Sequence, residues 1–265
     1  MMPKVSVLVP TLGDRKKEII RLFESITSQS YRAIEVVVVA QDNFDVVSNL
    51  CESYSNRVKV IYVSTDKKGL SKARNIGISK ASGEIILLSD DDCWYEGKAI
   101  GRIVECFNGN KELDILLTQI YDPIANAPYK TYSSESKRLT KPTELLSRSS
   151  IEIAFRKKGN VLDFDELFGL GAVYVAGEEN DYLIRSLKKG KKIQYEPFIT
   201  VYHEKKVKRE TNKQLIAKGA FYSKNFGFVI SNMVLLRDLL IKRQNNYRWF
   251  WNGYFDYKKR DKGKY

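Results

Sequence analysis

The sequence predicts an α/β fold with a mostly parallel, twisted sheet flanked by helices. In its N-terminal part, short apolar runs rich in Val and Ile alternate with segments of helical periodicity, which is the pattern of strand–helix–strand units. Polar clusters follow several of these runs, where ligands of parallel sheets bind. The composition, 43% hydrophobic and 29% charged, is that of a globular chain with a substantial core.

Four apolar runs predict the buried strands. Each run is short, rich in β-branched residues and bounded by Pro, Gly or polar residues, which is typical of strands covered on both faces. The predicted strands are 4–9, 33–40, 58–63 and 84–92, and the last runs into three Asp residues.

Helices are predicted between these strands. Residues 15–28 place Ile19, Leu22, Phe23 and Ile26 at helical spacing. Further helices are predicted at 44–54, 69–82 and 97–108. Short loops between alternating strands and helices favour a parallel sheet.

The pattern weakens after this point. Residues 121–150 are rich in Pro, Ser, Thr, Lys and Tyr and predict a long loop, which in a compact domain is usually functional or mobile. The remaining predictions are strands at 151–155 and 172–175, a helix at 181–188, and a strand pair formed by 191–197 and 198–204.

Three adjacent carboxylates, Asp90, Asp91 and Asp92, are the strongest chemical feature. They repel one another unless a cation lies among them, and Mg²⁺ or Mn²⁺ would be held by such oxygen ligands. In an extended segment Asp90 and Asp92 point to one side and Asp91 to the other. The alternative is a solvated acidic turn, because acids are also favourable at a helix N-terminus.

Two further sites carry possible chemistry. His203 is the only histidine and ends an apolar run at the sheet edge. Its imidazole could bind Mn²⁺ there. Alternatively, His203 is an ordinary surface or core residue. Glu178 and Glu179 form a second crowded acidic pair. Such a pair often contains a general base, although both acids could simply begin a helix.

Charge is distributed unevenly. Residues 203–265 hold 16 basic and 5 acidic residues, a net charge of +11, whereas residues 1–202 carry +2. A basic tail predicts a polyanionic partner, either nucleic acid or an anionic membrane surface. The three cysteines lack metal-site spacing and predict reduced thiols in a cytosolic protein. No signal peptide is visible, and no apolar stretch approaches the about 20 residues that span a bilayer.

The tail itself has the pattern of an interfacial anchor. Residues 226–241 place apolar side chains along one helical face: Phe228, Val229, Met233, Leu236, Leu239 and Leu240. Beyond them, cations alternate with Tyr247, Trp249, Phe250, Trp251, Tyr254, Phe255 and Tyr257. Aromatic rings among cations suit the headgroup region of an anionic membrane. The alternative for 226–241 is a helix packed on the rest of the protein.

Four motifs resemble those of glycosyltransferase family 2 in order and spacing. They are VSVLVPT from Val5, GLSKARNIGISKASGEIILLSDDD from Gly69, GEENDYLIR from Gly177 and VYH from Val201. The resemblance covers about residues 4–204. It implies a GT-A fold, a nucleotide-sugar donor, a divalent metal (Mn²⁺ or Mg²⁺) and direct displacement with inversion at the anomeric carbon. The similarity is strongest to bacterial enzymes of capsule and lipopolysaccharide assembly.

The resemblance also implies roles for the acidic residues. Asp90 and Asp92 match the family's Asp-x-Asp motif. In that match Asp92 is the direct metal ligand, and Asp90 serves the side of the site that holds the ribose and the metal. Asp91, between them, belongs to the donor-binding set. His203 matches the histidine that completes the metal and diphosphate site.

Other positions match the donor site and the base. Pro10 and Thr11 match the turn that lies against the nucleoside, and Arg74 matches an arginine near the base and diphosphate. Glu179 aligns with the catalytic base, usually an Asp, and Glu178 precedes it.

One departure concerns the nucleoside. Many members carry an Asp-Asp pair after the second strand, whereas this chain has Ala40, Gln41 and Asp42. Either Gln41 or Asp42 must then supply the contact to the nucleoside. We expect the donor to be a UDP-sugar.

We therefore expect an inverting, metal-dependent glycosyltransferase in the cytoplasm, peripheral on the inner face of the cell membrane. Residues 1–204 would form the catalytic domain, with 1–95 binding the nucleotide sugar and 96–204 facing a glycan acceptor on a polyprenyl carrier. Residues 205–265 would be the basic extension. The alternatives are a nucleotidyltransferase, for which VPTLGDRKK is a poor phosphate loop, and a nucleic-acid-binding protein. We expect no nucleic-acid partner.

Overall fold

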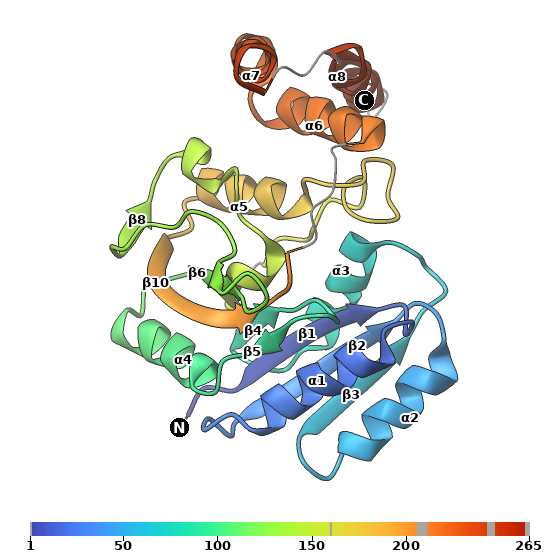
Figure 1. Ribbon diagram of the computed structural model, residues 1–265, viewed down its shortest axis with the longest axis vertical. Helices are drawn as coiled ribbons and strands as arrows, with labels where there is room; N and C mark the ends of the chain where they lie inside the picture. Colours follow the sequence, from blue (N-terminus) through green and yellow to red (C-terminus); the bar gives the residue numbers. More distant parts are fainter. Residues whose placement is uncertain (1, 160, 206–210, 243–246, 263–265) are drawn as a thin grey trace.

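A computed structural model describes residues 2–159, 161–205, 211–242 and 247–262, with the side chains of 238–242 and 262 outside this description. Figure 1 shows a large twisted sheet with helices on both faces and a further group of three C-terminal helices at one end of the molecule. The predicted mixed α/β architecture is confirmed.

The sheet is parallel in its N-terminal half and mixed beyond it. Its strand order is β3 (Lys59–Ser64), β2 (Ile34–Ala40), β1 (Val5–Thr11), β4 (Ile85–Leu88), β9 (Ile153–Arg156), β6 (Ile115–Asp122), β10 (Ile193–Tyr202) and β5 (Trp94–Tyr95). The first four strands are mutually parallel. β9 runs antiparallel between β4 and β6, and β10 is parallel to β6 but antiparallel to β5.

Two helical layers cover the sheet. One face packs against α1 (Lys16–Thr27), α2 (Phe44–Tyr54) and α4 (Ala99–Gly109), and the other against α3 (Leu70–Lys80) and α5 (Glu178–Lys188). Along β1, Val7 belongs to the first core and Leu8 to the second. Because both faces are covered, every residue of β1 and β2 is buried, which explains their largely apolar sequences. Two polar residues in these strands, Ser6 and Glu35, are hydrogen-bonded to each other.

The predicted N-terminal elements are confirmed with one correction. β4 ends at Leu88 rather than at residue 92, and Asp91 and Asp92 lie in a turn. The alternation expected for an extended segment therefore does not apply to the three Asp side chains. Buried carboxylates need polar partners. Asp91 finds its partners, Thr11 and Arg15, at and just after the end of β1.

The later predictions fare less well. Residues 172–175 form no strand and contribute only an isolated bridge between Phe168 and Tyr174. The expected strand pair over 191–204 is the single strand β10, whose pairing with β6 is irregular between Tyr195 and Val201. The sequence pattern also missed β6, and α5 begins three residues before the predicted helix.

The long segment 121–150 contains short ordered elements. It holds β7 (Ala127–Pro128), β8 (Lys137–Leu139) and the 3-10 helix η1 (Pro142–Leu145), followed by a second 3-10 helix, η2 (Ser150–Glu152). β7 pairs with β6, and β8 pairs with β10.

The C-terminal helices are α6 (Asn212–Asn225), α7 (Gly227–Lys242) and α8 (Tyr247–Lys262). Two glycines let the backbones of α6 and α8 touch. A Cβ atom at Gly219 would lie 1.8 Å from the carbonyl oxygen of Phe250, and one at Gly253 would lie 1.9 Å from that of Ile216. Any larger residue at either position would force the two helices apart.

Several aromatic residues of α8 are buried, contrary to expectation. Phe250, Tyr254 and Tyr257 are 2%, 0% and 7% exposed, and the ring of Tyr257 contacts those of Phe168 and Tyr174. The proposed place of these three side chains in a membrane interface is therefore wrong. They attach α8 to α6 and to the loop that precedes α5.

Apolar side chains of α7 remain exposed. Phe228, Val229, Met233 and Leu236 are 55%, 71%, 66% and 57% exposed, whereas the side chains of Leu239 and Leu240 lie outside the described residues. Among the described helices, none has the length and hydropathy needed to cross a bilayer.

We predict that Gly253→Ala lowers the free energy of unfolding by about 1–3 kcal/mol, because the added methyl group overpacks the α6–α8 contact. Gly101→Ala is the matched control. It lies inside α4 with no atom within 4 Å of the new Cβ, so it should be neutral or stabilise by up to about 1 kcal/mol. Urea denaturation of both variants tests this, and equal effects would show that the close helix contact is absent.

Candidate active site

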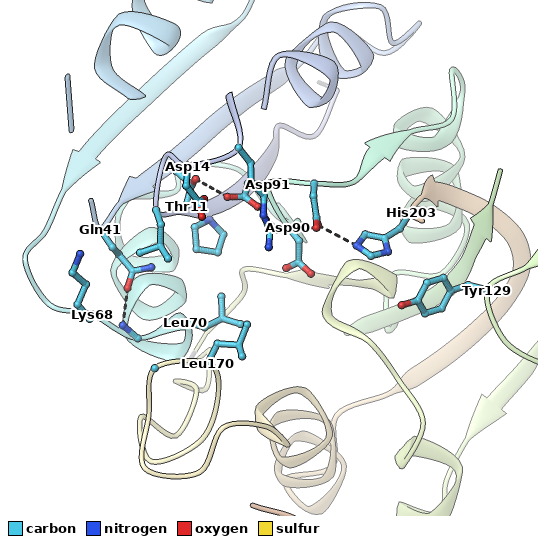
Figure 2. A pocket seen from close by; sticks show the side chains of 16 residues that line it. Thr11, Asp14, Gln41, Lys68, Leu70, Asp90, Asp91, Tyr129, Leu170 and His203 are labelled. Carbon is cyan, nitrogen blue, oxygen red and sulfur yellow. Dashed lines mark hydrogen bonds and ion pairs between the residues drawn. The ribbon is translucent and has the colours of Figure 1, made fainter. Parts of the chain in front are cut away.

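A cavity of about 510 Å³ opens at the carboxyl ends of the parallel strands (Figure 2). β1 ends there at Thr11, β2 at Ala40 and β4 at Leu88. The cavity is lined by Pro10, Thr11, Leu12, Asp14, Arg15, Gln41, Lys68, Gly69, Leu70, Asp90, Asp91, Asp92, Tyr129, Leu170, Gly171 and His203. The crossover helices return the chain to the opposite edge, so polar residues that follow different strands meet here.

Asp91 holds the acidic turn against the end of β1. Its carboxylate accepts hydrogen bonds from the Thr11 hydroxyl at 2.7 Å and the Arg15 guanidinium at 3.0 Å. Burial raises the pKa of Asp91, and the bonds from Thr11 and Arg15 oppose that rise. Asp91 is 8% exposed. These contacts fix Asp91 in the wall of the cavity.

Asp92 and His203 come together at one end of the cavity. The Nε2 atom of His203 lies 3.0 Å from Asp92 Oδ1, and Arg15 donates to Asp92 Oδ2 at 2.7 Å. The edge of the His203 ring packs against Tyr129, with ring centroids 5.5 Å apart. Tyr129 directs its hydroxyl toward the cavity (Figure 2).

The donor set of this pair suits a divalent ion. One carboxylate and one imidazole leave further ligand positions for substrate phosphates, as Mg²⁺ and Mn²⁺ require. Within the described ranges, no three His, Cys, Asp or Glu side chains are grouped closely enough to hold an ion by themselves. Asp90, the third expected ligand, also lines the cavity, and its carboxylate lies 3.3 Å from both the Arg74 guanidinium and the Ser150 hydroxyl.

Arg74 joins the acidic turn to the start of α5. Its side chain is 0% exposed, and its guanidinium lies 3.3 Å from Asp90 and 3.4 Å from Glu178. Arg74 is not among the residues that line the cavity. Its position therefore favours electrostatic support of the two acids over direct contact with a ligand.

Glu178 and Glu179 begin α5 after Gly177, which has the positive φ of 101° that glycine tolerates. Glu178 is 4% exposed, whereas Glu179 is half-buried. Burial raises the pKa of both carboxyls. Arg74 opposes the rise at Glu178, and the charge of Glu178 adds to the rise at Glu179. Neither side chain lines the cavity.

The opposite end of the cavity is apolar and closed by a loop from the second half of the chain. Leu70 and Leu170 lie at this end near Gln41 (Figure 2), and Leu12 also lines the cavity. The backbone N–H of Leu70 donates to the carbonyl oxygen of Leu170 at 2.9 Å. The hydroxyl of Ser71 donates to the carbonyl oxygen of Phe168 at 2.6 Å. These bonds hold the loop over the start of α3.

Of the two candidates for the nucleoside contact, only Gln41 lines the cavity. It is 5% exposed, and its side-chain oxygen accepts a hydrogen bond from the backbone N–H of Gly69 at 2.7 Å. The Asp42 carboxylate is 58% exposed and does not line the cavity, although its partner Lys68 does.

Sequence patterns thus located most of the site. Pro10, Thr11, Gln41, the three Asp residues and His203 all line one cavity, as the strand-end argument predicted. The sequence pattern does not single out Arg15, which lies in the weak phosphate loop VPTLGDRKK, although a cation next to a strand end near three acids is a usable signal. Tyr129 and Leu170 come from loops without a readable motif.

The sequence profile of glycosyl transferase family 2 matches residues 6–168. Among curated proteins, the chain is 32% identical over 123 residues to the poly(ribitol-phosphate) beta-N-acetylglucosaminyltransferase TarS of Staphylococcus aureus, covering 45% of this chain and 21% of TarS. It is 34% identical over 111 residues to the GalNAc(5)-diNAcBac-PP-undecaprenol beta-1,3-glucosyltransferase of Campylobacter jejuni, covering 40% of this chain and 35% of that enzyme. The matches thus span well under half of either relative.

Solved structures show the same fold. The structure of S. aureus TarS in complex with UDP-GlcNAc matches with a TM-score of 0.69 at 20% identity, covering 92% of this chain and 75% of that one. The mannosyltransferase PcManGT of Pyrobaculum calidifontis, in complex with GDP-Man and Mn²⁺, matches with a TM-score of 0.61 at 17% identity, covering 87% and 65%.

Proposed function

The chain belongs to glycosyltransferase family 2, and we propose that it transfers a sugar from a UDP-sugar to a glycan acceptor with inversion at the anomeric carbon. The observation that carries this proposal is a cavity with Asp92 and His203 at one end and an apolar slot holding Gln41 at the other. A diphosphate suits the first end and a nucleobase the second. Family membership decides against the nucleotidyltransferase alternative.

We propose that Asp92 and His203 hold Mn²⁺ or Mg²⁺ together with the donor diphosphate. A divalent ion in this place would stabilise the negative charge that develops on the leaving nucleoside diphosphate. The protein adds its own cation, because Arg15 lines the cavity and is fixed by Asp91 and Asp92. The structure of PcManGT with GDP-Man and Mn²⁺ supports the choice of metal by fold likeness alone.

Glu179 is the proposed general base. It would take the proton of the acceptor hydroxyl while that oxygen bonds to the anomeric carbon and the bond from this carbon to the diphosphate oxygen breaks. Attack opposite the leaving group inverts the anomeric configuration without a covalent intermediate. Glu178 is held by Arg74, and Asp181 is bound to Arg185 and Lys224, so neither acid is as available as Glu179.

The acceptor is proposed to be a glycan on a polyprenyl carrier in bacterial surface polysaccharide synthesis, of the capsule or lipopolysaccharide type. The support is the undecaprenol-linked substrate in the name of the C. jejuni relative and the basic C-terminal segment. In this proposal residues 1–204 are the catalytic domain, and residues 205–265 attach it to the inner face of the cell membrane.

The exposed apolar side chains of α7 are the proposed membrane contact. Phe228, Val229 and Met233 are each more than half exposed, and the basic residues Lys258, Lys259 and Arg260 of α8 are exposed as well. Shallow apolar insertion together with cations is how peripheral proteins bind anionic lipid. Deleting α8 would also uncover Phe168 and Tyr174, so substitutions on α7 test this contact better than truncation.

For the metal, we predict that a panel of nucleotide sugars reveals slow release of UDP from a UDP-sugar, which EDTA abolishes and Mn²⁺ restores. Asp92→Asn and His203→Ala should each raise the Mn²⁺ concentration for half-maximal release by about tenfold or more, since each removes a ligand. Glu52→Gln, at an exposed position of α2 outside the cavity lining, is the control and should change nothing. Full activity in EDTA would refute the metal dependence.

For the base, we predict that Glu179→Gln lowers kcat by about 10²–10⁴-fold and leaves UDP affinity within a few fold, because an amide cannot accept the proton. Because burial and the neighbouring charge of Glu178 raise the pKa of Glu179, we expect wild-type transfer to increase with pH through the neutral range, since the ionised form is the active one. If Glu179→Gln remains active and Glu178→Gln does not, the base is the preceding residue.

For the membrane, we predict that the protein sediments with vesicles containing phosphatidylglycerol and is released by high salt, which screens the basic residues. The double variant Val229→Asp, Met233→Asp should bind these vesicles about tenfold more weakly with unchanged donor hydrolysis. Ile124→Asp, at a 78% exposed site between β6 and β7, is the control. Equal sedimentation with phosphatidylcholine vesicles, or none with either lipid, contradicts the proposal.

A further inference from the structure

The two residues proposed to hold the metal come from distant parts of the chain. Asp92 lies in the turn after β4, and His203 follows Tyr202, the last residue of β10. Their facing atoms are 3.0 Å apart. Both residues lie next to a short ladder in which Trp94 of β5 pairs with Tyr202. A strand of two residues is shorter than usual, so this ladder is a weak support for the position of the two side chains.

Arg21 of α1 contacts the chain next to both residues. Its Nη2 group donates to the carbonyl oxygen of Asp92 at 3.1 Å, and its Nη1 group pairs with the Glu204 carboxylate at 3.3 Å. Its guanidinium lies over the indole of Trp94, with 3.6 Å between the central carbon and the ring centroid. One rigid group thus joins the acidic turn, β5 and the residue that follows His203.

These contacts need the shape of arginine as well as its charge. The guanidinium is planar and presents its N–H groups as a fixed fork, so it stacks on Trp94 while it donates to two acceptors. A lysine ammonium in this place keeps the charge but has neither the fork nor the flat face. Arg21 does not line the cavity, so it acts on a bound ion through the residues that it holds.

We propose that Arg21 is a positioning residue that keeps Asp92 and His203 at the separation at which they can share a divalent ion. The inference rests on the proposed metal site and deepens it by naming a group outside the cavity that preorganises the site. Removing a group that orients metal ligands typically lowers metal affinity by about 10–100-fold. The positive charge of Arg21 by itself repels a cation, so any contribution of Arg21 in favour of the ion comes from positioning.

The experiment measures UDP binding by calorimetry, in EDTA and in Mn²⁺, for the wild type and for Arg21→Lys. The ratio of the two dissociation constants reports how much of the UDP affinity depends on the ion, and it cancels changes in the rest of the donor site. We expect Mn²⁺ to strengthen UDP binding to the wild type by about tenfold or more, and this ratio to fall about fivefold or more in Arg21→Lys. Binding in EDTA should stay within about twofold, because Arg21 does not touch the cavity.

Arg21→Gln separates position from charge. It removes the positive charge, so it should raise the ratio if Arg21 acted by charge alone, whereas loss of positioning should lower it. The Arg21 side chain is 36% exposed, so neither substitution opens a cavity in the core. A melting temperature within about 2 °C of the wild type shows that each variant is folded.

Arg102→Lys is the matched control. Arg102 stacks on Phe198 with 4.0 Å between its central carbon and the ring centroid, and neither residue lines the cavity, so this variant should keep the wild-type ratio. An unchanged ratio in Arg21→Lys, or a raised ratio in Arg21→Gln, would overturn the positioning role and leave the metal site intact. A wild type that binds UDP equally well in EDTA and in Mn²⁺ would overturn the metal site and the inference together.

Discussion

The buried guanidinium of Arg74 is the constraint on which the rest of the site depends. Asp90 and Glu178 approach each other from opposite halves of the chain, and without a cation between them their charges would repel in a region of low dielectric. Arg74 is 0% exposed and lies within 3.4 Å of both. It therefore sets the distance between the acidic turn after β4 and the start of α5, and with it the position of Glu179.

The cavity divides its chemistry between two ends, and the sheet explains why. Parallel strands β1, β2 and β4 deliver Thr11, Gln41 and Asp90 to one edge, but this edge alone is an open groove. Later segments of the chain close it with Leu170 on the apolar side and Tyr129 with His203 on the charged side. Apolar walls suit a nucleobase, whereas fixed carboxylate and imidazole groups suit a metal and a diphosphate.

The C-terminal helices illustrate how one sequence pattern serves two purposes. Cations alternating with aromatic residues are typical of a membrane interface, yet Phe250, Tyr254 and Tyr257 are used in packing. Gly219 and Gly253 allow α6 and α8 to approach so closely that these rings become buried. Val229, Met233 and Leu236 of α7 remain exposed beside this packing, as do Tyr247 and Phe255 of α8.

By itself, the sequence determined the parallel half of the sheet, its helices and the gathering of strand-end residues in one cavity. These features follow from local periodicity and from the direction of parallel strands, which are written in short stretches of chain. Only the tertiary structure decided that Asp90 faces Arg74, that Gln41 and not Asp42 enters the cavity, and that β6 and β10 pair. The physical reason is that such contacts join residues far apart in the chain, for example Arg74 with Glu178 and Gln41 with Gly69, and short-range patterns carry no information about which partner each side chain meets.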